Sequence, residues 1–194
     1  MRRSAVVMVM LLALVGSAWG QVPDKQPPMP LQPEPVRVPL APTAALSATD
    51  VDLRSGDQAP DFQLDSSLGG VVRRADLKGR WFVLVFDERR TKLAPLGAVE
   101  DSIRALGVQA MGVCPDGVGA LKTFAAREKI AFPLLSDPTR EISQLFGMYD
   151  DGHRAIQSGL VIVDTKGIVR MVLQGPSLHA DDVLQMVKHV VRGA

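Results

Sequence analysis

Residues 81–100 read WFVLVFDERRTKLAPLGAVE: an unbroken apolar run, a polar turn, and a segment expected to become helical near Gly97. A continuous apolar run is typical of a central strand that is covered on both faces. In an α/β domain, the end of such a strand is the usual place for chemistry. This turn holds charges, a threonine and a proline, but no cysteine and no histidine. The stretch therefore predicts an α/β core whose site edge lacks an obvious reactive atom.

Apolar spacing on either side of this strand predicts further strands and helices. Strands are expected at residues 62–64, 71–72, 81–86, 108–113, 132–135, 160–163 and 168–173, and helical stripes at residues 99–106, 118–125, 142–146 and 183–191. Gly147 is expected to cap the third helix, and residues 164–167 to form a hairpin turn. The order is a leading hairpin followed by β-α-β-α-β-α-β-β-α. It predicts a mixed central sheet with helices on both faces.

The N-terminal fifty residues have a different character from the rest of the chain. Residues 1–20 combine Arg2-Arg3, an apolar run and a small-residue ending, which predict a cleaved signal peptide. The run is short for a membrane span, so an uncleaved anchor is the lesser alternative and the only membrane contact expected. Residues 21–50 contain eight prolines and predict an extended, disordered linker. The folded domain is expected over residues 51–194, in an exported protein that is periplasmic or secreted.

The charges and the reactive side chains exclude several classes of function. The chain has 22 basic and 21 acidic residues, a balance that does not favour nucleic acid. Cys114 is the only cysteine, so no internal disulfide is possible. The three histidines, His153, His179 and His189, are too scattered to suggest a metal site. No metal and no cofactor is expected.

Several short strings lie along the chain in a characteristic order. They are GDQAPDF (56–62), DLKGR (76–80), PD (115–116), FPLLSD (132–137) and VIVD (161–164). Together they resemble the peroxiredoxins, the alkyl hydroperoxide reductase/thiol-specific antioxidant family, over about residues 56–191. The resemblance implies a thioredoxin-like fold and a thiol-dependent reduction of peroxides. It also makes self-association through the sheet edge or the turn region an expectation.

The resemblance further implies a catalytic cysteine in the polar turn, within a Thr-x-x-Cys pattern. Thr91 takes the threonine position, which puts Ala94 where the cysteine belongs; counting from the strand end puts Pro95 there instead. The family's arginine, just before the strand at residue 160, is replaced by Ser158 within Gln157-Ser158-Gly159. Both the nucleophile and its cation are therefore expected to be missing.

Three functions remain open at this stage. The first is a degenerate, non-catalytic binding or assembly module, with an unidentified envelope protein or a second copy as its partner. The second is an antioxidant thiol peroxidase that uses Cys114 or a partner's thiol, although Cys114 is also a residue type often buried in cores. The third is a different α/β activity that recruits Asp87, Glu88 or Asp116. Arg89 and Arg90 either give the turn a positive field or are solvated charges.

Overall fold

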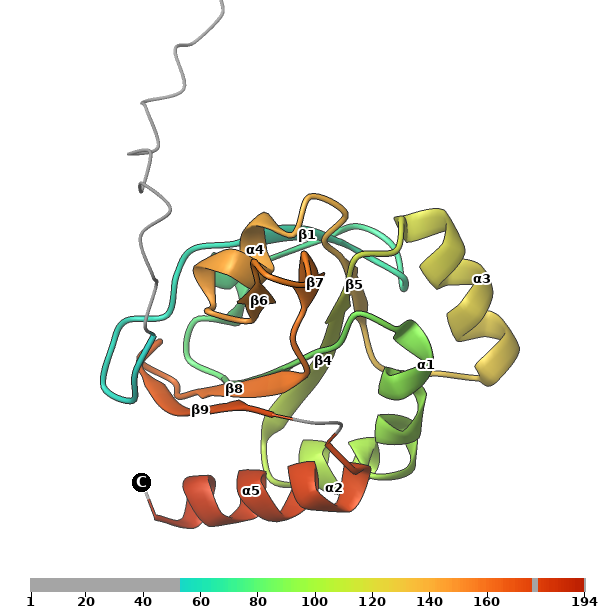
Figure 1. Ribbon diagram of the computed structural model, residues 1–194. Coiled ribbons are helices and arrows are strands. Elements are labelled where there is room, and N and C mark those ends of the chain that lie inside the picture. The colour runs from blue at the N-terminus through green and yellow to red at the C-terminus, as the bar shows by residue number, and fades with distance from the viewer. Residues whose placement is uncertain (1–52, 176–177, 194) are drawn as a thin grey trace, which may run out of the picture. The chain divides into compact units, whose positions relative to one another are not determined.

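The computed structural model describes residues 53–175 and 178–193, which form a mixed sheet flanked by helices (Figure 1). The seven strands lie in the order β2-β1-β5-β4-β3-β8-β9. Their bounds are β1 (Gln63–Ser66), β2 (Val71–Arg73), β3 (Trp81–Phe86), β4 (Val108–Cys114), β5 (Leu134–Ser136), β8 (Gly159–Val163) and β9 (Val169–Gln174). The expected signal peptide and linker lie outside the described residues.

The quoted apolar run forms the centre of this sheet, as predicted. β3 pairs in parallel with β4 and antiparallel with β8, and its residues from Phe82 to Phe86 are all buried. β4 continues in parallel with β5, while the leading hairpin of β1 and β2 joins antiparallel to β5. A strand with partners on both edges and helices on both faces has no contact with water. This environment explains why β3 carries no polar residue.

A small second hairpin was not predicted from the sequence. It consists of β6 (Tyr149–Asp150) and β7 (Ala155–Ile156), which pair antiparallel. Two-residue strands are too short to display an alternating pattern. That turn, residues 151–154, is closed by the N–H of His153, which donates to the Asp150 carboxylate at 3.0 Å.

The helices confirm the predicted order, with one correction. They are the 3₁₀ helix η1 (Arg74–Leu77), α1 (Arg90–Leu93), the 3₁₀ helix η2 (Ala94–Ala98), α2 (Glu100–Ala105), α3 (Val118–Glu128), α4 (Glu141–Leu145) and α5 (Ala180–Arg192). Helical structure after β3 starts at Arg90, not near Gly97, so the expected polar turn is largely helical. Pro95 has no N–H to donate back to Thr91, which explains why the α-helix gives way to a 3₁₀ turn there.

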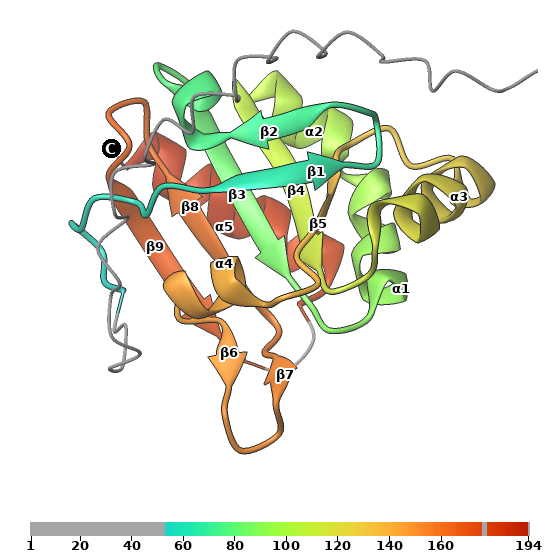
Figure 2. The ribbon, with the colours of Figure 1, turned by 90° about the horizontal axis from the view of Figure 1, so that it is seen from above.

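The two faces of the sheet carry separate cores. Figure 2 shows α5 and α2 on one face and α4 on the other. The first face packs buried side chains of β3 and β4 against η2, α2, α3 and α5. The second face is rich in aromatic rings, with Phe62, Phe82, Phe86 and Phe146 in contact. Gly147 follows α4 with φ of 68° and its N–H donates to the Gln144 carbonyl, which confirms the predicted cap.

The predicted β8–β9 turn is held by the buried carboxylate of Asp164. It accepts the N–H groups of Lys166 at 2.8 Å and Ile168 at 2.9 Å, and the Arg170 Nε at 2.7 Å. Burial alone would raise the pKa of Asp164, but the Ile168 N–H, the Arg170 guanidinium and the Lys166 N–H outweigh it and lower the pKa. A lowered pKa means that this carboxylate stabilises the fold above its unfolded pKa, and that the stabilisation is lost as pH falls.

Replacing this carboxylate by an amide tests the sign of that effect. Asp164→Asn is expected to lower the free energy of unfolding by about 1–3 kcal/mol at pH 7, since the charge-assisted hydrogen bonds are lost. The difference should shrink below about pH 4, because the carboxyl of the unfolded wild type is protonated there and the native carboxylate then gives less net stabilisation. Urea unfolding of both proteins at pH 7, 5 and 3 measures it. A difference that stays constant down to pH 3 would contradict this account.

Candidate functional site

Three connections meet at the edge of the sheet where β3 ends. The register pairs Phe86 with Val113 of β4 and with Gly159 of β8. The end of β3, the end of β4 and the start of β8 therefore lie side by side. Asp87 directly follows β3, Cys114 is the last residue of β4 and Ser158 directly precedes β8, so the topology gathers these three residues at one edge.

Asp87 and Ser158 form a direct hydrogen bond at this edge. The Asp87 side chain is buried; its Oδ1 accepts the Arg89 N–H at 2.9 Å and its Oδ2 accepts the Ser158 hydroxyl at 2.5 Å. Ser158 is the residue that stands where the resemblance implies an arginine. A carboxylate and a hydroxyl therefore satisfy each other at the place where a cation was expected.

The cavity beside this pair is nearly filled. It measures about 10 Å³ and is lined by Val85, Phe86, Asp87, Lys92, Leu93, Ser158, Gly159 and Leu178. A water molecule needs about 10–15 Å³ of such space. The cavity therefore has room for at most one water and none for an organic peroxide.

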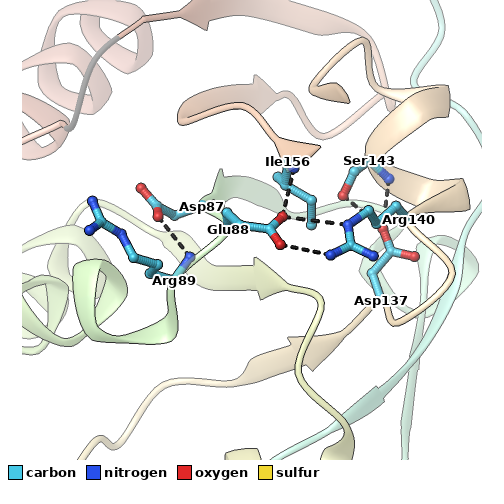
Figure 3. Close-up of polar contacts among 7 residues, drawn as sticks. All are labelled: Asp87, Glu88, Arg89, Asp137, Arg140, Ser143 and Ile156. Carbon is cyan, nitrogen blue, oxygen red and sulfur yellow. Dashed lines mark hydrogen bonds and ion pairs between the residues drawn. The ribbon is translucent and has the colours of Figure 1, made fainter. Parts of the chain in front are cut away.

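Glu88 joins two further loops to the end of β3 (Figure 3). Its carboxylate accepts the Arg140 Nη2–H at 2.7 Å and the Ile156 N–H at 2.7 Å. Burial would raise the pKa of Glu88, but the bonds from Arg140 and Ile156 outweigh it and hold the pKa below its ordinary value. Arg140 has φ of 60°, a left-handed conformation uncommon for residues other than glycine. The ion pair therefore fixes a loop whose backbone is itself unusual.

Asp137 holds the loop that contains Arg140 through hydrogen bonds to Ser143 of α4. Its Oδ2 accepts both the N–H and the hydroxyl of Ser143, at 2.8 and 2.7 Å, and its own N–H donates to the Cys114 carbonyl at 2.9 Å. Asp137 and Ser143 are both buried. The sequence had singled out Asp87 and Glu88 only as alternatives, and had missed Asp137, Arg140 and Ser143. A polar residue at a strand end was the one available signal for Asp137.

Thr91 and the two positions where the resemblance implies a cysteine follow this edge on α1 and η2. Thr91 is exposed on α1, Ala94 is half-buried against the core, and Pro95 is exposed. Ala94 and Pro95 border a hollow of about 290 Å³. Its other lining residues are Gly97, Ala98, Glu100, Asp101, Glu128, Lys129, Ile130 and Ala131. Three carboxylates and one ammonium group line it, and the carboxylates are ion-paired: Glu100 and Asp101 with Arg104, and Glu128 with Arg127.

Cys114 is fully enclosed at the end of β4. Its side chain has 0% exposure and belongs to the core of the α5 face. Burial raises the pKa of the Cys114 thiol to about 12. The nearby Arg90 lowers this pKa by less than burial raises it; its guanidinium forms an ion pair with Asp116 and lies over the Phe124 ring, 5.4 Å from its centre. Arg90 is therefore engaged, whereas Arg89 is exposed.

Two further properties concern residues 53–175 and 178–193 only. Within them no three histidine, cysteine or acidic side chains gather in a way that would hold a metal ion. None of the helices in the same two segments is both long and apolar enough to span a bilayer.

The mixed sheet and the order of its strands and helices define a thioredoxin-like protein of the peroxiredoxin type. Residues 55–172 match the AhpC/TSA family, and the chain belongs to that family. Peroxiredoxin Bcp of Escherichia coli is 28% identical over 156 residues, which cover 70% of this chain and 96% of that protein. A putative peroxiredoxin of Mycobacterium tuberculosis is 31% identical over 105 residues, or 51% of this chain and 67% of that protein.

Solved structures confirm the expected fold. Peroxidoxin BcpB of Mycobacterium tuberculosis superimposes with a TM-score of 0.64 at 20% identity, covering 73% of this chain and 97% of that one. AhpC of Enterococcus faecalis superimposes with a TM-score of 0.64, also at 20% identity, covering 71% of this chain and 92% of that one. At such low identity the similarity shows the fold alone. The chemistry has to be argued from the residues of this chain.

Proposed function

We propose that this chain is an exported, non-catalytic member of its family that acts as a binding or assembly module in the cell envelope. Its partner is an envelope protein or a second copy of the chain. The family reaction needs a thiolate that attacks a peroxide: an S–O bond forms, the O–O bond breaks, and water or an alcohol leaves. The state of Cys114 carries the proposal, because the chain's only sulfhydryl is enclosed and has a pKa of about 12.

Three further observations support this proposal. Ala94 and Pro95 offer no nucleophile at the position where the resemblance implies a cysteine. Ser158 binds Asp87 where a cation would be needed. The small cavity at that pair has no room for an organic peroxide. The hydrogen bond between Ser158 and Asp87 and the filled cavity hold the end of β3 rigid. A rigid surface suits recognition by a partner.

The other two functions find less support in the geometry. A peroxidase that uses Cys114 would have to open β4 before each turnover, because no described cavity reaches the sulfur. A different activity would need a carboxylate free to move a proton. Asp87 is bound by Ser158, Glu88 by Arg140, and Asp116 by Arg90.

A peroxidase assay on the wild type and two variants tests the proposal. With dithiothreitol as reductant, the wild type is expected to consume hydrogen peroxide no faster than buffer with reductant alone. Ala94→Cys should form a sulfenic acid at about the rate of a free thiol. Adding Ser158→Arg should raise that rate, by less than about tenfold for each unit by which the cation lowers the thiol pKa, because a more acidic thiol gives a weaker nucleophile. Wild-type turnover that stops on alkylation of Cys114 would reject the proposal.

A further inference from the structure

A group of cations lies at the end of the sheet opposite the candidate site. We define the basic corner as Arg74, Lys78, Arg80, Lys166 and Arg170. The N–H of Gly79, in the loop before β3, donates to the Thr165 carbonyl of the β8–β9 turn at 3.1 Å and brings the two segments together. Figure 2 shows both connections at the same end of the sheet. Four of the five side chains are exposed, and Arg74 is half-buried.

The carboxylates nearby do not neutralise this corner. Arg74 pairs with Asp61 and Arg170 pairs with Asp164. Lys78, Arg80 and Lys166 form no ion pair with any carboxylate of residues 53–175 and 178–193. The one other acid on these two connections is Asp76, which is exposed on η1. Five cations therefore face three carboxylates, and Arg54 and Asp57 beside them add one charge of each sign.

The N-terminal segment joins the folded domain at this same corner. The Ser55 hydroxyl donates to the Arg170 carbonyl at 3.0 Å, and the Gly56 N–H donates to the Val169 carbonyl at 2.8 Å. In the uncleaved form of the chain, the apolar run of residues 5–15 would therefore be attached to the domain on its basic side.

We propose that the basic corner docks the domain on an anionic lipid surface. Exposed lysines and arginines on turns suit a flat layer of phosphate headgroups, which attracts charge without needing shape complementarity. This inference does not depend on whether the chain reacts with peroxide.

Vesicle binding by the full chain tests this inference. The probes are vesicles of phosphatidylcholine alone and vesicles that also contain phosphatidylglycerol. The test variant is Lys78→Gln/Arg80→Gln/Lys166→Gln. The control is Lys92→Gln/Lys122→Gln/Lys129→Gln, which removes the same charge from α1 and α3. All three proteins keep the same N-terminal apolar run, so its contribution cancels.

At low salt the test variant is expected to bind the anionic vesicles about 100-fold more weakly than the wild type, at about 5-fold per cation. The control should lose less than about 5-fold, and the wild-type preference for anionic vesicles should fade as salt screens the charges. Circular dichroism of each variant confirms that the fold is retained. Equal losses in the two variants, equal wild-type binding to both vesicle types, or tighter binding to soluble polyglutamate than to the vesicles would overturn the inference.

Discussion

Native protein treated with a thiol reagent at pH 7 is expected to modify Cys114 about a thousand times more slowly than the same reagent modifies free cysteine. The physical reasons are the enclosure of the side chain, which has 0% exposure, and the pKa of the thiol, which burial raises from the ordinary cysteine range to about 12. Each unit of increase removes about nine-tenths of the reactive thiolate. Hydrogen peroxide should show the same inertness, since it also reacts with the thiolate. Mass spectrometry of timed samples measures the modified fraction.

Denaturation provides the internal control for this prediction. In guanidinium chloride the burial of Cys114 is lost, so its modification rate should approach that of free cysteine. A thiol that is only enclosed becomes reactive on denaturation, whereas a chemically blocked thiol does not. If native Cys114 forms sulfenic acid as fast as free cysteine does, β4 opens readily and the assignment as a non-catalytic module fails.

Phe146→Ala is expected to lower the free energy of unfolding by about 3–5 kcal/mol. The ring has 0% exposure, and its centre lies 5.9 Å from that of Phe62 and 5.7 Å from that of Phe86. Truncation removes buried apolar surface and leaves a cavity that these neighbouring rings cannot fill without moving. Because Phe86 ends β3, the loss should also loosen the edge that carries Asp87 and Glu88. Urea unfolding at pH 7 measures the change.

Leu68→Ala is the matched control for this truncation. Leu68 is 56% exposed in the turn between β1 and β2, so shortening it should change the free energy of unfolding by less than about 0.5 kcal/mol. A loss below about 1 kcal/mol for Phe146→Ala would mean that the aromatic face repacks. In that case α4 would not hold the site edge in place.

The sheet and its order of strands were predictable because burial imposes a pattern on the sequence itself. The run from Trp81 to Phe86 has no polar residue since both of its faces are covered, and Gly147 marks the end of α4 through its left-handed φ. The start of α1 at Arg90 was missed. Its polar residues resemble a turn. Leu93 is the one buried residue of this helix, and its packing against the core could not be read from the local sequence.

What the sequence alone determined is the fold class, the family resemblance and the lack of cysteine at residues 94 and 95. Only the tertiary structure decided that Ser158 donates a hydrogen bond to Asp87 and that Arg140 binds Glu88, 52 residues away in the sequence. It also decided that Cys114 is fully buried. The physical reason is distance along the chain. Periodicity and turn signals arise between near neighbours, whereas these hydrogen bonds and this burial exist only once β3, β4 and β8 lie side by side.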